Sequence, residues 1–195
     1  MVYFYKIVLD EVEYLAYMGK DKEENEILIE YSWDEDVWFH VDNLSSAHVY
    51  LRLKTDMTIT NIPKDLLEQL AQLCKANSIK GCKMDNVRIV YTPTRNLKKT
   101  KGMETGQVGF YNEQQMYYTT VPKKNNEILN NLKRNRIERD HQVFIDMRLK
   151  RLKYLRKKEK KRKEEEGQEI ERLKLIKEKE EEERKQADMK NMVSN

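Results

Sequence analysis

The feature that most constrains the fold of this chain is a change of composition near Pro122. All three prolines and most of the aromatic residues lie before residue 123, whereas the segment after it consists mainly of residues with high helix propensity. Residues 1–122 carry 14 Lys and Arg against 18 Asp and Glu, and residues 123–195 carry 24 against 16. The sequence therefore predicts a core-forming domain at 1–122 and, at 123–195, a charged helical or coiled-coil-like tail that is frayed or disordered at its end.

Hydrophobic periodicity predicts how the first segment folds. Runs rich in aromatic and β-branched residues predict strands, and leucines at three- and four-residue spacing predict helices. The expected strands cover 1–10, 13–20 and 86–92, with hairpins at 36–53 and 106–121, and the expected helices cover 21–32 and 61–78. Because the strands adjoin one another in sequence, we expect an α+β fold. It is a mostly antiparallel sheet with helices packed on one face, followed by a long charged C-terminal helix.

The segment 36–53, DVWFHVDNLSSAHVYLRL, gathers many of the residues that could carry chemistry. Its apolar residues alternate with polar and aromatic ones, which predicts a β-hairpin with one apolar face. If the turn is centred on Leu44, cross-strand partners share a face, and the side chains that point away from the core are Trp38, His40, Asp42, Ser46, His48 and Tyr50. We expect this face to be exposed, so that its rings can stack on unpaired bases.

The same face raises a catalytic alternative. Ser46 could act as a nucleophile, with His40 or His48 as its base and Asp42 orienting that base. Such a hydrolase would act on an ester such as peptidyl-tRNA. No G-x-S-x-G nucleophile elbow accompanies these residues, so the sequence predicts no catalytic residues.

A metal site is a second alternative. His40, His48, Cys74 and Cys82 have the side chains that zinc prefers, but not the short ligand spacings of zinc motifs. The chain also has neither a P-loop nor a dinucleotide-binding glycine motif. The sequence therefore predicts no metal and no cofactor.

Charge segregation within the first segment favours binding. Residues 1–74 carry 6 basic and 15 acidic side chains, and residues 75–122 carry 8 and 3. Lysines in glycine-bearing loops suit a phosphate backbone, although an ordinary solvated basic loop is the plain alternative. We expect a continuous basic zone beside the hairpin face that binds nucleic acid through Lys75, Asn77, Ser78, Lys80, Lys83, Arg88, Arg95, Lys98, Lys99 and Lys101.

A denser basic block lies in the tail. Residues 148–163 hold 11 basic side chains against one acidic, and residues 164–183 reverse to 10 acidic against 4 basic. This block predicts salt-sensitive, sequence-independent affinity for RNA, with anionic lipid or a nuclear import receptor as alternatives. The charge run interrupts any heptad repeat, so we expect a monomer. After Leu155 we expect Glu–Lys pairs at four-residue spacing to stabilise the helix. The expected contacts are Arg148, Lys150, Arg151, Lys153, Arg156, Lys157 and Lys158.

Four long blocks also carry a family resemblance. YMGKDKEENEILI, DVWFHVDNLSSAHVYLRL, KANSIKGCKMDNVRIVYTPTRNLKKTKGMETGQVGF and VPKKNNEILNNL are similar, in order and spacing, to the coiled-coil domain-containing protein 25 family. That family joins a single NFACT-R domain to a charged helix, and the resemblance covers residues 1–133. It implies an α+β domain that is regarded as RNA-binding and that, in larger ribosome quality-control factors, accompanies recognition of tRNA and stalled ribosomes.

The resemblance implies one further alternative. Animal members are described as sensing extracellular DNA at a membrane, a property tied to their N-terminal region. Here that region reads GKDKEE, with a net charge of −1, so we do not expect the membrane role in this chain.

Together these observations predict a nonenzymatic RNA-binding module in translation quality control. Ribosomal or transfer RNA and the ribosome are the expected partners, with DNA or a protein that docks on the tail as alternatives. Two cysteines without a signal-peptide pattern favour a reducing compartment, and no run is long and apolar enough to span a bilayer. We therefore expect a cytoplasmic location, with the nucleus as an alternative.

Overall fold

The computed structural model describes the backbone of residues 1–193 and the side chains of residues 1–185 and 189. The chain divides into two compact units, residues 1–148 and residues 149 onward. The expected fraying at the end of the tail concerns residues outside this description.

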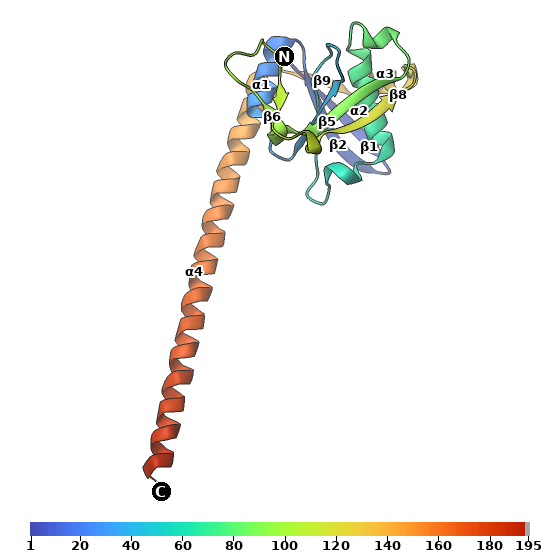
Figure 1. The fold of residues 1–195 in the computed structure, drawn as a ribbon. Helices are drawn as coiled ribbons and strands as arrows, with labels where there is room; N and C mark the ends of the chain where they lie inside the picture. The colour runs from blue at the N-terminus through green and yellow to red at the C-terminus, as the bar shows by residue number, and fades with distance from the viewer. Residues whose placement is uncertain (194–195) are drawn as a thin grey trace. The chain divides into compact units, whose positions relative to one another are not determined.

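Seven strands of the first unit form one sheet in the order β8-β5-β3-β4-β2-β1-β9, and each neighbouring pair is antiparallel (Figure 1). The predicted α+β class, with a mostly antiparallel sheet and a long C-terminal helix, is therefore confirmed. The strands of this sheet are β1 (Val2–Leu9), β2 (Val12–Gly19), β3 (Asp36–Val41), β4 (Val49–Arg52), β5 (Val87–Pro93), β8 (Tyr117–Val121) and β9 (Arg136–Arg139). A second sheet pairs β6 (Leu97–Lys98) with β7 (Gly109–Phe110).

Two of the helices in this unit begin at a residue whose side chain caps the first turn. Helix α1 (Lys22–Tyr31) starts at Asp21, whose carboxylate accepts a hydrogen bond from the amide of Glu24 at 2.9 Å. Helix α2 (Lys64–Ala76) starts directly after Pro63. Helix α3 (Asn126–Arg134) is capped by Asn125, which accepts from the amides of Glu127 and Ile128. Short 3-10 turns η1 (Ile59–Asn61), η2 (Gly81–Lys83), η3 (Thr94–Asn96) and η4 (Glu113–Gln115) complete the unit.

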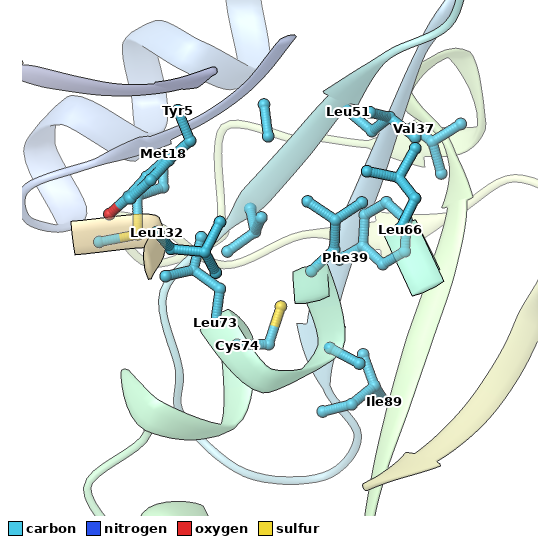
Figure 2. Packing of buried hydrophobic residues seen from close by; sticks show 14 of the residues in the cluster. Tyr5, Met18, Val37, Phe39, Leu51, Leu66, Leu73, Cys74, Ile89 and Leu132 are labelled. Atoms are coloured by element: carbon cyan, nitrogen blue, oxygen red, sulfur yellow. The ribbon is translucent and has the colours of Figure 1, made fainter. Parts of the chain in front are cut away.

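One face of the sheet packs on α2 and α3. Alternate strand residues such as Val37, Phe39 and Leu51 point into this core, where they meet Leu66 and Leu70 of α2. Figure 2 shows Phe39, Leu66, Cys74 and Ile89 gathered around the α2 ribbon. This is the apolar hairpin face that the period of two predicts.

The opposite face of the sheet is covered as well. Its strand residues pack with Leu28 of α1, Leu97 of β6 and Phe144 at the start of the C-terminal helix. Antiparallel strands that are apolar on both faces are buried on both faces. The sequence predicted helices on one face, and the structure adds this second core beneath the other.

Two segments differ from their predicted secondary structure. The expected hairpin at 106–121 is wrong, because β7 pairs with β6 while β8 pairs with β5. The tail was expected to be mostly helical, yet β9 interrupts it and pairs with β1 at the edge of the sheet. Since α3 packs against α2 and β9 completes the sheet, the first unit extends well beyond the boundary expected at Pro122.

The remaining residues form α4 (His141–Val193), which runs through Gly167 without a break. Most of its side chains beyond residue 155 are exposed through residue 185, and ion pairs at three- and four-residue spacing link residues 159–166. These pairs match the support expected for this part of the helix. No helix within the described residues is both long and apolar enough to cross a membrane.

Candidate nucleic-acid interface

The hairpin of β3 and β4 brings together the side chains that the sequence placed on one face. Trp38 lies opposite Tyr50, as predicted. The ring centroids of Trp38 and His40 are 5.2 Å apart, those of Trp38 and His48 are 5.2 Å apart, and those of the two histidines are 5.1 Å apart. The register and the shared face are therefore those expected from the period of two.

The expected exposure of this face is wrong for Trp38, His48 and Tyr50, whereas His40, Asp42 and Ser46 are partly exposed. Trp38 is 2% exposed, His48 is 3% exposed and Tyr50 is fully buried. Phe110 of β7 packs on the Trp38 ring at 5.7 Å, within the second core. Rings buried in this way cannot stack on a base unless the covering segment moves, so in this structure they stabilise the domain and offer no docking surface.

The serine-hydrolase alternative lacks the geometry it needs. The Ser46 hydroxyl donates to the carbonyl of Ala47 at 3.1 Å and accepts from the amide of Val41, while His40 Nδ1 lies 2.7 Å from the Val41 carbonyl. Burial lowers the pKa of His48 to about 3, so its ring is a weak base at neutral pH. A nucleophile requires a base within hydrogen-bond reach, and Ser46 has no such bond to either histidine.

The zinc alternative fails for a topological reason. Cys74 belongs to α2 and lies in the core on one face of the sheet, whereas His48 packs against Trp38 on the opposite face. Burial also raises the pKa of the Cys74 thiol, which disfavours the thiolate that would bind a metal. Within the described residues, no group of three or more His, Cys, Asp or Glu side chains is arranged to hold an ion.

Three residues at the start of the predicted basic zone hold the fold together. Lys75 is 1% exposed, and its ammonium group donates to the carbonyls of Met84, Val121 and Pro122. The Asn77 amide group bonds back to the Leu73 carbonyl at 2.8 Å, and the Ser78 hydroxyl donates to the Ser45 carbonyl at 2.6 Å. The expectation that Lys75 and Ser78 are exposed is therefore wrong, because both are buried.

Two further cations of the zone are paired within the domain. Lys99 donates to Glu26 of α1 at 2.6 Å and to the carbonyls of Glu104 and Gln107, so it fastens its own loop onto α1. Arg88 donates to Asp42 at 2.6 Å. Both charges are therefore partly neutralised where they lie.

The remaining cations of the zone are exposed but do not form one strip. Lys80 and Lys83 precede β5, whereas Arg95, Lys98 and Lys101 follow it. The strand has seven residues, which at about 3.3 Å each separate its ends by about 20 Å. The predicted continuous zone is thus divided between opposite ends of a strand.

The structure adds two lysines at the first of these ends. The amide of Asn86 donates to the Pro122 carbonyl at 2.8 Å, which places exposed Lys123 and Lys124 beside the loop that carries Lys80 and Lys83. The sequence signal was available, since KK directly precedes the Asn125 helix cap. It was missed because the boundary expected at Pro122 assigned both lysines to the tail.

The basic block of α4 is different in character from the zone in the domain. Arg148 is paired with Asp34 at 3.2 Å and Arg151 lies 5.5 Å from the Tyr154 ring. The others are exposed and form no ion pair with any described residue, namely Lys150, Lys153, Arg156, Lys157 and Lys158. The block thus offers five unpaired positive charges within two and a half helical turns.

Comparisons with known proteins agree with this surface chemistry. Residues 1–112 match the family described as NFACT protein RNA binding domain. Coiled-coil domain-containing protein 25 of Bos taurus is 56% identical over 137 residues, which are 70% of this chain and 66% of the relative. The Dictyostelium discoideum homolog is 52% identical over 140 residues (72% and 67%), and protein JLP2 of Saccharomyces cerevisiae is 43% identical over 143 residues (71% and 69%). The match to the bovine relative thus spans slightly less than two thirds of its length.

A solved structure supports the fold. The C-terminal part of the fibronectin/fibrinogen-binding protein from Streptococcus suis superposes with a TM-score of 0.54 at 18% identity, over 69% of this chain and 49% of that chain. The family description supports a nucleic-acid-binding role, and its match covers more than half of the sequence. The chain therefore belongs to the NFACT RNA-binding domain family and is a relative of the coiled-coil domain-containing protein 25 proteins.

Proposed function

We propose that this chain is a nonenzymatic module that binds ribosomal or transfer RNA in the cytoplasm, as part of ribosome-associated quality control. The observation that carries the proposal is the run of five unpaired cations between Lys150 and Lys158 on α4. Cations without intramolecular partners gain most from a polyanion, because they release its counterions without first losing an ion pair.

The domain contributes a second basic surface. Lys80, Lys83, Lys123 and Lys124 are exposed and lie on two loops that the Asn86–Pro122 hydrogen bond holds together. Lysines on adjoining loops contact phosphates without reading a base sequence. Specificity for one RNA would then depend on groups that contact bases or recognise RNA shape.

A charge-matched pair of variants of the full chain tests the proposal. The first replaces Lys150, Lys153, Arg156, Lys157 and Lys158 with Gln. The control replaces Lys160, Lys161, Arg162, Lys163 and Arg172 with Gln, which removes the same charge from cations that are paired with glutamates. Fluorescence anisotropy with single-stranded RNA, transfer RNA and duplex DNA over a salt series measures both affinity and the number of ionic contacts.

The first variant is expected to lose most of its RNA affinity, with a salt slope smaller by about 3.5 if all five cations contact a single strand. The control is expected to lose much less. Equal losses would show that only net charge matters, and unchanged RNA affinity in the first variant would contradict the proposed role of the block. Tighter binding of duplex DNA than of either RNA would contradict the choice of RNA.

A further inference from the structure

A hollow of 240 Å³ lies between the C-terminal end of α2, α3 and the first two strands. Both helices and both strands contribute to its apolar lining, which consists of Tyr5, Met18, Leu73, Ala76, Leu129 and Leu132. Figure 2 shows Tyr5, Met18, Leu73 and Leu132 close together at this end of the core. Tyr5, Met18, Leu73 and Leu132 are at most 5% exposed, so the accessible apolar floor of the hollow is formed mainly by the partly exposed Ala76 and Leu129.

The rest of the lining is polar and carries only positive charge. Lys124, Lys133 and Arg136 contribute three cations, and Asn77, Asn126 and Asn130 contribute three amides, with no carboxylate in the lining. Arg136 also pairs with Glu138 at 2.7 Å, whereas Lys124 and Lys133 are exposed and form no ion pair within the described part of the chain. Two free cations at an apolar hollow suit an anionic ligand that has an apolar part.

Hydrogen bonds fix the rim of the hollow. The buried Gln72 side chain donates to the Lys123 carbonyl at 2.9 Å and accepts from the Asn125 amide at 3.0 Å. Asn125 in turn caps α3, so the segment that carries Lys124 and Asn126 is held against α2. A rim that is ordered before binding lowers the entropy cost of taking up a ligand.

We infer that this hollow binds one nucleotide unit of single-stranded RNA, an inference that rests on the proposed function. The apolar floor contacts the base and ribose, Lys124 and Lys133 contact the phosphate, and the side-chain amides of Asn126 and Asn130 hydrogen-bond to base edges. Contacts to base edges together with contacts to the charged backbone are a common way of recognising single-stranded RNA. The site would supply the base contacts that the basic block of α4 lacks.

A neighbouring hollow provides an internal contrast. It lies beside α3 and is lined by Gln69, Glu127, Ile128, Asn130, Asn131 and Arg134. It has one cation, which Glu127 balances, and only one aliphatic residue. Its chemistry does not suit a nucleotide, which makes Arg134 a suitable position for a control substitution.

The test uses the full chain and two charge-matched variants. K124Q/K133Q removes the two free cations of the hollow, and K64Q/R134Q removes two exposed cations outside it. Each protein is titrated with uridine and adenosine 5′-monophosphates, with inorganic phosphate and with a short single-stranded RNA. Backbone amide chemical shifts at Ala76, Asn126 and Leu129, which line this hollow and not its neighbour, report its occupancy.

Nucleotides are expected to shift these amides saturably, and K124Q/K133Q is expected to weaken both nucleotide and RNA binding by about tenfold, with a smaller salt slope for RNA. K64Q/R134Q is expected to stay within about twofold of the parent chain. Absence of the shifts, or equal effects of the two variants, would overturn the inference. Equal affinity for phosphate and nucleotides would also overturn it, because the floor would then contribute nothing.

The outcomes separate this inference from the proposed function. If RNA binds through α4 but nucleotides leave the hollow unchanged, only the nucleotide site fails. If nucleotides occupy the hollow but the unaltered full chain does not bind RNA, the proposed function fails and the hollow is a site for free nucleotides.

Discussion

Several positive charges in the domain stabilise its fold, whereas the positive charges in the basic block of α4 are exposed to solvent. Arg52, Lys75 and Lys99 are buried or half-buried and donate to acceptors within the domain. Lys153 and Lys157 of α4 are exposed and have no ion pair among the described residues. Because desolvation must be offset by good hydrogen bonds, a buried cation holds its neighbours in place and is not available to a ligand. A count of lysines and arginines cannot separate these roles, but burial and partners can.

The largest expected effect belongs to the domain. Arg52 donates two hydrogen bonds to the fully buried Asp36, at 3.0 and 3.1 Å, and stacks 3.5 Å from the Trp33 ring. Replacing Arg52 with Leu leaves Asp36 buried without its cation, so we expect a loss of about 3–5 kcal/mol in the free energy of unfolding. Urea denaturation measures this loss. A loss below about 1 kcal/mol would place Arg52 with the dispensable surface cations.

Lys75 provides a second test of the same contrast. Its replacement by Met preserves the length of the side chain but removes the ammonium donor to the carbonyls of Met84, Val121 and Pro122, of which Pro122 keeps the hydrogen bond from the Asn86 amide. We expect the free energy of unfolding to fall by about 2–3 kcal/mol, while RNA affinity of the folded protein stays unchanged. Denaturation and anisotropy on the same preparation measure both quantities. A variant that keeps its stability but loses RNA affinity would show that Lys75 contacts RNA, as the sequence predicted.

Because His48 is buried, we expect the free energy of unfolding of the domain to depend on pH, an effect that the exposed charges of α4 should not produce. Burial lowers the pKa of His48 to about 3 in the folded state, against about 6.5 in the unfolded chain. As the pH falls, His48 therefore takes up a proton in the unfolded state before it does so in the folded state. The contribution of neutral His48 to the free energy of unfolding is complete above pH 6.5 and declines towards pH 3. Burial lowers the pKa of His40 in the same direction.

Between pH 7 and pH 5, His48 should account for a loss of about 2 kcal/mol in the free energy of unfolding. His48→Phe, which keeps an aromatic ring but cannot titrate, is expected to lose correspondingly less over the same interval. Denaturation midpoints at the two pH values test this. An unchanged pH dependence in His48→Phe would mean that the ring is hydrated in the folded state.

The sequence predicted local structure better than it predicted exposure. The period of two in 36–53 gave the strand pairing and the face shared by Trp38 and Tyr50. It could not reveal that Leu28, Leu97 and Phe144, remote in sequence, converge to cover that face. Tyr17 and Val90 on neighbouring strands also point to it, and such two-sided apolarity is the signal that both faces are buried.

Long-range pairing explains most of the remaining misses. The strand β9 has the sequence RIER and lies between two helices, so only its partner β1 makes it a strand. The distribution of basic residues was visible in the sequence, but their partners were not. Lys99 and Glu26 are 73 positions apart, and no local pattern links them.

The smallest expected effect lies on α4 and tests whether pairing itself withholds a cation from RNA. Glu159 accepts hydrogen bonds from Arg162 at 2.9 and 3.2 Å and pairs with Lys163 at 3.4 Å, all in solvent. Glu159→Gln should leave the unfolding midpoint of the domain unchanged, because exposed pairs contribute little to stability. It should raise RNA affinity about twofold, because it frees Lys163 beside the unpaired block and leaves Arg162 with Glu166 as its remaining partner. The control, Glu180→Gln, makes the same change of charge at a glutamate that has no ion pair among the described side chains. An equal rise in RNA affinity in that variant would show that net charge, and not pairing, governs the binding of RNA by α4.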